Sequence, residues 1–194
     1  ENIEVFCMAD LWEFCKFNKR MYIHPFLDFD VEIIKSDKFS VCHSPYTKVA
    51  TNQKGSTQIK IAADMLGNAY PLNYICITDK TWAETLRIKS TAHFFVDQLS
   101  QGNHYSHTGY KGGLGKSGLE AMLLKCLTFC GGVKIESDLD PAPFIKVGDG
   151  LDLFEQMFYY KDNKEQAQSI IEAQYQWAKK NTNAEFVAKR ITEI

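Results

Sequence analysis

The sequence predicts an α/β fold in which helices flank a mostly parallel sheet. Short apolar segments alternate with helical patterns along most of the chain, which is typical of strand–helix–strand units. The chain has 194 residues, of which 45% are hydrophobic and 24% are charged, as in an average soluble globular domain. The last part of the chain, residues 150–194, reads as helical nearly throughout.

Strands and helices alternate strictly in the first half of the chain. Each predicted strand is a short apolar run, and each predicted helix carries an apolar periodicity of three to four residues. These elements are the strand FSVCH (39–43), the helix 56–68 with its Ser/Thr start, the strand LNYICIT (72–78), the short helix 80–89 and the strand AHFFVDQL (92–99).

A long polar and glycine-rich loop, residues 100–115, opens the second half. The elements after it are the helix 117–125, the strand LTFCGG (127–132), the extended segment APFIKV (142–147) and the helical region 150–194, broken at 162–163 and 181–183. Residues 1–35 are expected to form a connector in which YIHPF (22–26) is extended. Residues 36–194 are expected to form one domain.

Charge and hydropathy exclude several classes of protein. The net charge of −2 gives no broad basic field for nucleic acid or an acidic membrane surface. No apolar run approaches the ~18 residues of a membrane span, and the start has no secretory signal, so a cytoplasmic location is expected. The first residue is Glu rather than Met, so we expect a trimmed chain or a fragment.

The six cysteines are expected to be free thiols in a reducing cytosol. None forms a Cys-x2-Cys pair, and Cys42, Cys76 and Cys130 lie in apolar runs that are typical of buried strands. His104 and His107 are the only close pair of histidines, and no cysteine or carboxylate lies near them in the sequence. A polar loop is therefore favoured over a metal site.

The segment GYKGGLGKSGLEAMLLKC (109–126) suggests phosphate binding. A Walker A loop requires Gly-x4-Gly-Lys-Ser/Thr, but Tyr110 stands where the first glycine belongs. Such a loop also follows its strand directly, whereas FFVDQL ends about ten residues before the glycines. A P-loop-like NTPase is therefore disfavoured, and a flexible surface loop remains an alternative.

Two turns between a strand and a helix carry both lysine and glycine. In the first, Lys48 and Lys54-Gly55 precede the helix that begins at Ser56; in the second, Lys111 and Lys116 flank the glycines. Glycine allows close approach of the backbone, and the amides at a helix start favour an anion. In parallel sheets such turns meet beyond the carboxyl ends of the strands, so one phosphate group could use both.

Glu120 has two interpretations. Ser117-Gly118-Leu119-Glu120 has the spacing of a capping box, in which the carboxylate accepts from the backbone amide of Ser117. Alternatively, the carboxylate binds both hydroxyls of a nucleotide ribose, as an acidic side chain does in dinucleotide folds. The local sequence favours the capping box.

The segment GLGKSGLEAMLLKCLTFCGG resembles the Gly-Phe-Gly…Leu-Glu-Ala-Met-Ala…Gly-x-Pro-Val segment of retaining GT-B glycosyltransferases (group 1, or family 4-like). That segment belongs to their C-terminal domain, which binds the nucleotide sugar. The likeness continues in order along most of the chain. It includes VFCMADLWEFC…YIHPFLDFD for the end of the N-terminal domain, SVCHSP…QKGSTQI for the first strand and Lys-Gly turn, FFVDQL for the strand before the donor loop, and NTNAEFVAKRITEI for the closing helix.

This resemblance implies a Rossmann-like domain, the C-terminal half of a GT-B fold, that binds a nucleoside-diphosphate sugar for transfer to an unknown acceptor. It implies that Glu120 binds ribose, which reverses the local preference for capping. It implies no cofactor and no metal, and an N-terminal domain that this chain lacks and that transfer would require. The residues implied to bind the diphosphate are Lys48, Lys54 and Gly55 in the first turn, and Gly113, Leu114, Gly115, Lys116 and Ser117 in the second.

Two positions depart from the family pattern. Gly112 stands where the family usually has the first acid of Glu-x7-Glu, which contacts the donor sugar. Lys48 is the nearest cation to a position that is usually arginine, and lysine cannot reproduce the bidentate geometry of arginine. A non-catalytic nucleotide-binding or interaction module derived from a GT-B half is therefore the alternative.

Overall fold

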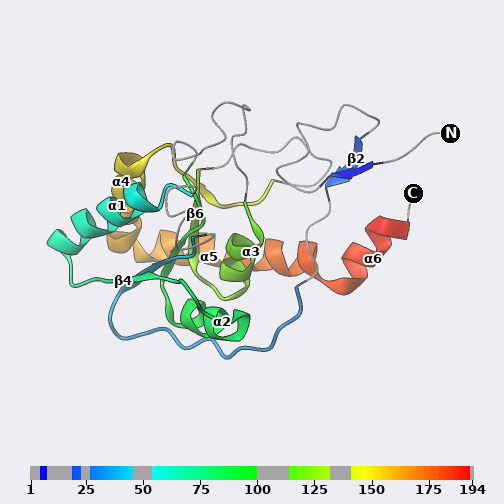
Figure 1. Cartoon of the computed structure of the whole chain (residues 1–194), viewed down its shortest axis with the longest axis horizontal. Coiled ribbons are helices and arrows are strands. Elements are labelled where there is room, and N and C mark those ends of the chain that lie inside the picture. Colours follow the sequence, from blue (N-terminus) through cyan, green and yellow to red (C-terminus); the bar gives the residue numbers. More distant parts are fainter. Residues whose placement is uncertain are drawn as a thin grey trace.

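A five-stranded parallel sheet lies at the centre of the computed structural model (Figure 1). The structure describes residues 5–7, 19–22, 27–45, 54–99, 114–131 and 141–192. The order of the strands across the sheet is β4-β3-β5-β6-β7, and every neighbouring pair is parallel. The strands are β3 (Ser40–His43), β4 (Asn73–Cys76), β5 (Phe94–Val96), β6 (Leu127–Cys130) and β7 (Ile145–Lys146).

A separate two-stranded parallel sheet joins β1 (Val5–Cys7) to β2 (Lys19–Tyr22). The predicted extended segment 22–26 overlaps β2 only at Tyr22, and residues 23–26 lie outside the described residues. The boundary between connector and domain at residue 35 remains a prediction.

Helices cover both faces of the main sheet. Those of the first half are α1 (Ser56–Ala69), α2 (Trp82–Thr91) and α3 (Lys116–Leu123), and those of the second half are α4 (Gly150–Asp162), α5 (Lys164–Thr182) and α6 (Ala184–Thr192). The predicted breaks are confirmed, because Asn163 separates α4 from α5 and Asn183 separates α5 from α6. In the described part of the chain, no helix has the length and apolar character needed to cross a membrane.

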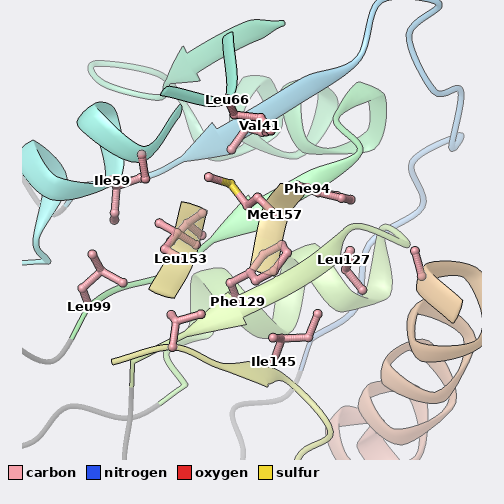
Figure 2. Packing of buried hydrophobic residues seen from close by; sticks show 14 residues of the cluster. Val41, Ile59, Leu66, Phe94, Leu99, Leu127, Phe129, Ile145, Leu153 and Met157 are labelled. Carbon is pink, nitrogen blue, oxygen red and sulfur yellow. The ribbon is translucent and has the colours of Figure 1, made fainter. Parts of the chain in front are cut away.

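Alternate residues of the buried strands point to opposite faces of the sheet. Val41, Phe94 and Phe129 pack with Leu66 of α1 and Met157 of α4 in one large core, which Figure 2 shows. The residues next to them along the strands, Cys42 and Phe95, pack instead against Ala121 of α3 and Ile88 of α2. Because the central strands are covered on both faces, their sequences are apolar without alternation.

The free thiols that the structure describes are those of Cys42, Cys76, Cys126 and Cys130. Cys42 and Cys130 are buried, as predicted, and so is Cys126. The prediction for Cys76 is wrong, because this thiol is exposed. Cys76 ends β4, and β4 is the edge strand of the sheet with a neighbour on one side only.

Candidate functional site

The first lysine–glycine turn and the start of α3 meet beyond the carboxyl end of β5. Asp97, the residue after β5, joins them: one carboxylate oxygen accepts from Lys54 Nζ at 3.1 Å and the other from the backbone amide of Gly115 at 2.6 Å. The Asp97 side chain is fully buried, whereas that of Lys54 is 19% exposed. The two turns predicted to share an anion are therefore held side by side by one buried carboxylate.

Gly55 sets the shape of the first turn. Its φ of 72° lies in the left-handed region, where a side chain is strained. A Cβ at this position would also lie 2.9 Å from Leu99 Cβ. The backbone amide of Leu99 donates to the carbonyl of Lys54 at 3.0 Å, so the turn is fixed against the segment that follows β5.

Gly118 allows α3 to approach Asp97 closely. A Cβ at this position would lie 2.4 Å from Leu114 Cδ1 and 3.1 Å from a carboxylate oxygen of Asp97. A larger side chain here would therefore require Leu114 to shift and would crowd the Asp97 carboxylate. Leu114, one of the predicted loop residues, is buried here and packs beneath α3.

Only some amides at the start of α3 have partners among the described residues. The Asp97 carboxylate accepts a hydrogen bond from the amide of Gly115. The carbonyl of Gly115 accepts from the amides of Gly118 and Leu119 at 3.0 and 3.1 Å. The amides of Lys116 and Ser117 have no acceptor in the described part of the chain. These two amides, beside the positive end of the helix dipole, are the donors available for an anion.

Glu120 does not form the predicted capping box. The helix begins at Lys116 with Gly115 as its N-cap, so Ser117 already lies inside the first turn and no side chain caps the helix. A capping box does form elsewhere in the chain, between Thr81 and Glu84 at the start of α2. The capping interpretation of Glu120 is therefore wrong, because the helix starts two residues earlier than the pattern requires.

Instead, Glu120 lies in a buried network with two residues of α2. Its carboxylate, on a residue only 4% exposed, accepts from Lys89 Nζ at 2.7 Å and from Trp82 Nε1 at 2.8 Å. Lys89 is fully buried and also donates to the carbonyl and hydroxyl oxygens of Ser117, at 3.0 and 2.7 Å. Lys116 Nζ lies 3.9 Å from the same carboxylate. The Glu120 carboxylate thus has a fixed position and a compensated charge.

His43, at the end of β3, links strands of the sheet to the start of α1 next to the site. Its Nδ1 lies 2.8 Å from the carbonyl of Val96, so Nδ1 carries the proton, and Nε2 accepts from the hydroxyl of Ser56 at 2.8 Å. Burial, with a smaller contribution from the nearby charge of Lys54, lowers the pKa of His43 to about 4, against the opposing effect of the hydrogen bond to Val96. A neutral His43 therefore ties β3 and β5 to the first residue of α1.

The structure assembles most of the predicted residues at one edge of the sheet. Lys54 and Gly55 lie at one side of Asp97, and Leu114, Gly115, Lys116, Ser117 and Glu120 lie at the other. Lys48 and Gly113 lie outside the described residues, as do Lys111 and Gly112. Within the described ranges, no group of His, Cys, Asp and Glu side chains could hold a metal ion.

Four residues of this region were not predicted from the sequence: Asp97, Lys89, Trp82 and His43. A signal existed for Asp97, because a carboxylate directly after a buried strand stands where parallel α/β sheets bind ligands. Lys89 gave no such signal, since a lysine in a polar helix is ordinarily solvated.

Comparisons with known proteins support the fold. No protein-family profile matches the chain, and no curated protein matches it by sequence. Among solved structures, a mutant of S. aureus TarM in complex with fondaparinux, α-GlcNAc-glycerol and UDP superposes with a TM-score of 0.67 at 11% identity. The match covers 96% of this chain and 43% of that protein, so the chain spans less than half of its length. At this identity the likeness shows the fold alone: a Rossmann-like α/β domain that matches part of a GT-B protein.

Proposed function

We propose that this chain is the donor-binding half of a GT-B glycosyltransferase, and that it binds a nucleoside-diphosphate sugar at the edge of the sheet beside Asp97. One observation carries the proposal: Asp97 accepts from both Lys54 and the Gly115 amide, so it holds a cationic side chain beside the first residues of α3, where the amides of Lys116 and Ser117 have no acceptor among the described residues. The fold of a protein whose structure contains UDP supports the same class of ligand.

The diphosphate would lie between Lys54 and the start of α3. Lys54 Nζ has three donors, and Asp97 engages one of them. The amides of Lys116 and Ser117 lie in the first turn of α3, and the exposed ammonium group of Lys116 adds a second positive charge. These groups would also stabilise the charge that develops on the leaving diphosphate, which is the electrostatic part of catalysis that this domain can supply.

The ribose would bind at Glu120. Each carboxylate oxygen accepts one hydrogen bond from the protein, from Lys89 or from Trp82, and each retains a lone pair for a ribose hydroxyl. Lys89 holds the carboxylate in place through its hydrogen bond, and Trp82, which is 48% exposed, forms the outer wall. The base, the sugar and the acceptor are not assigned.

Titration calorimetry with UDP, GDP and ADP, alone and as sugar conjugates, tests the proposal directly. We expect one of the three nucleotides to bind, without a requirement for magnesium, because cationic side chains and amides replace the metal. A strict requirement for magnesium would favour a P-loop-like site instead.

Removing the ribose hydroxyls from the ligand is the cleanest test of Glu120. We expect the 2′,3′-dideoxy form of the preferred nucleotide to bind about 10- to 100-fold more weakly than the ordinary form, because hydrogen bonds to a carboxylate are lost. Calorimetry with both ligands on the unaltered protein measures this. Changing the ligand avoids a Glu120→Gln variant, which would also leave Lys89 buried opposite a neutral amide. Equal affinity for the two ligands would exclude Glu120 as a ribose ligand.

A Lys54→Met variant tests the diphosphate position. Its affinity for the nucleoside diphosphate should fall by about tenfold or more, while its affinity for the free nucleoside should stay within about twofold. The ratio of the two affinities is the readout, because it is unaffected by any loss of folded protein. Lys60→Met is the matched control, since Lys60 is exposed on α1 and contacts only Asp64 in an i,i+4 pair. A parallel loss for both ligands would assign Lys54 a structural role.

The second candidate is a non-catalytic nucleotide-binding module. The observation that favours it is Gly112, where the resembled family carries its first acid. The full-length protein that contains this chain would separate the two functions in an assay for free nucleotide released from a nucleotide sugar. Release that depends on an acceptor supports the transferase, whereas tight binding without release supports the module.

A further inference from the structure

A cavity lies at the opposite edge of the sheet from the proposed donor site. It has a volume of about 510 Å³ and is lined by residues that precede β3, β5 and β6, among them Phe39, His93 and Lys125. The junction between α4 and α5 closes it from the other side with Lys161 and Lys164. Because Lys54, Asp97 and Gly115 follow the carboxyl ends of their strands, the two sites are separated by the length of the sheet.

The cavity has a strong excess of positive charge. Among the described residues that line it are four lysines, Lys35, Lys125, Lys161 and Lys164, and one carboxylate, Asp37. Lys35 donates to the carbonyls of Ala92 and Leu124, and Lys125 pairs with Glu172 at 3.3 Å. The other two lysines have no carboxylate partner in the described part of the chain.

Lys161 is held over aromatic rings rather than over an acid. Its Nζ lies 4.9 Å from the ring centre of Phe39 and 5.2 Å from that of Tyr70. Lys164, the first residue of α5, is exposed. An anion at the mouth of the cavity could therefore approach two unpaired ammonium groups without displacing an internal carboxylate.

His93 supplies a neutral donor. Its Nδ1 lies 3.3 Å from the backbone amide of Ser40, which can only donate, so Nδ1 is the acceptor and the proton lies on Nε2. Burial and the charges of Lys35 and Lys161 lower the pKa of His93, which keeps the ring neutral. The ring stacks at a tilt on Phe39, with 5.2 Å between centres, so the donor is part of the wall of the cavity.

Apart from Gln168, the rest of the lining is aliphatic or aromatic. Phe39, Phe94, Tyr160, Ile33 and Ile171 contribute most of it. Apolar walls with a few convergent polar groups are typical of small-molecule sites, and the volume is in their usual range. The cationic side chains in this lining are lysines. A lysine acts as a point charge and suits a phosphate, whereas a planar carboxylate ligand is matched best by arginine, so the lining favours a phosphate.

We propose that this cavity binds a phosphate monoester with an apolar body. The phosphate lies at the mouth between Lys161 and Lys164, and the apolar body lies against Phe39 and Ile171. A soluble organic phosphate and the headgroup of a phosphatidic acid share this chemistry. This proposal does not depend on the proposed donor site, since none of the described residues that line the cavity contacts Lys54, Asp97 or Glu120.

Calorimetry with 1-naphthyl phosphate, 1-naphthol and inorganic phosphate tests the site. The ester should bind more tightly than either of its halves, and an excess of UDP should leave its affinity unchanged. Lys161→Met and Lys164→Met should each weaken the ester about tenfold, the loss expected for one charged hydrogen bond. Lys60→Met, whose lysine lies on α1 outside the lining, is the matched control and should have no effect.

Lys164→Met keeps the test decisive if Lys161→Met unfolds the protein, since Lys164 is exposed and makes no ion pair within the described residues. Vesicles of phosphatidylcholine with and without phosphatidic acid distinguish the two sources of the phosphate. If the protein sediments only with the vesicles that contain phosphatidic acid, the ligand is a lipid. Three results would overturn the proposal: no binding of the ester or of the vesicles, equal binding to the Lys164→Met variant, or displacement of the ester by UDP.

Discussion

A Lys89→Met variant is expected to lose about 3–5 kcal/mol of unfolding free energy. Lys89 is fully buried and donates to Glu120 and to both oxygens of Ser117. Methionine fills a similar volume but leaves the Glu120 carboxylate, on a residue only 4% exposed, without its cation. Urea unfolding followed by circular dichroism measures the loss.

The double variant Lys89→Met/Glu120→Gln is the informative control. Replacing both members of a buried ion pair by neutral groups removes the uncompensated charge, so the double variant should be more stable than Lys89→Met alone. A single variant within about 1 kcal/mol of the unaltered protein would contradict the network.

Acidification from pH 6.5 to pH 4 is expected to cost roughly 3 kcal/mol of stability through His43. Burial lowers the pKa of His43 from 6.5 to about 4 in the folded protein. Between these two values the unfolded chain binds a proton that the folded protein does not, so the stabilisation is complete above pH 6.5 and is lost as the pH falls toward 4. The lowered pKa of His93 acts in the same direction.

A His43→Asn variant isolates this contribution. Asparagine does not titrate, so its curve of unfolding free energy against pH should be flatter between pH 4 and 6.5, even though its stability at neutral pH is lower. Chemical denaturation at several pH values gives both curves. Identical slopes for the two proteins would show that His43 does not carry the pH dependence.

The strands of the main sheet and the helices around it were predictable because each follows from local sequence, whereas β1 and β2 lie in the region expected to be a connector. Short apolar runs became the strands, and the helical region broke at Asn163 and Asn183 as expected. Cys76 shows the limit: its segment is as apolar as that of Cys42, but β4 lies at the edge of the sheet and β3 lies inside it. Strand order is a tertiary property, so burial of the thiol could not be predicted locally.

The position of the candidate site could be predicted from the sequence, but the contacts that hold its residues in place could not. The convergence of the Lys54 turn and the α3 start follows from strand–helix order in a parallel sheet. The role of Glu120 depends on where α3 begins, and a shift of two residues turns a capping box into a buried ion pair. Lys89 lies on a different helix, and only the packing of α2 against α3 brings it there.

The all-parallel pairing of the sheet has a consequence for how the chain folds. No strand of this sheet pairs with a sequence neighbour through a hairpin, and the adjacent strands β3 and β5 are bridged by His43 and Val96, which lie 53 residues apart along the chain. At a synthesis rate of about 5–20 residues per second, β3 leaves the ribosome roughly 3–10 s before β5. During that time the apolar edge of β3 has only β4 as a partner. We therefore expect closure of long loops to slow folding, and we expect β3 to be open to aggregation or to capture by a chaperone until β5 is made.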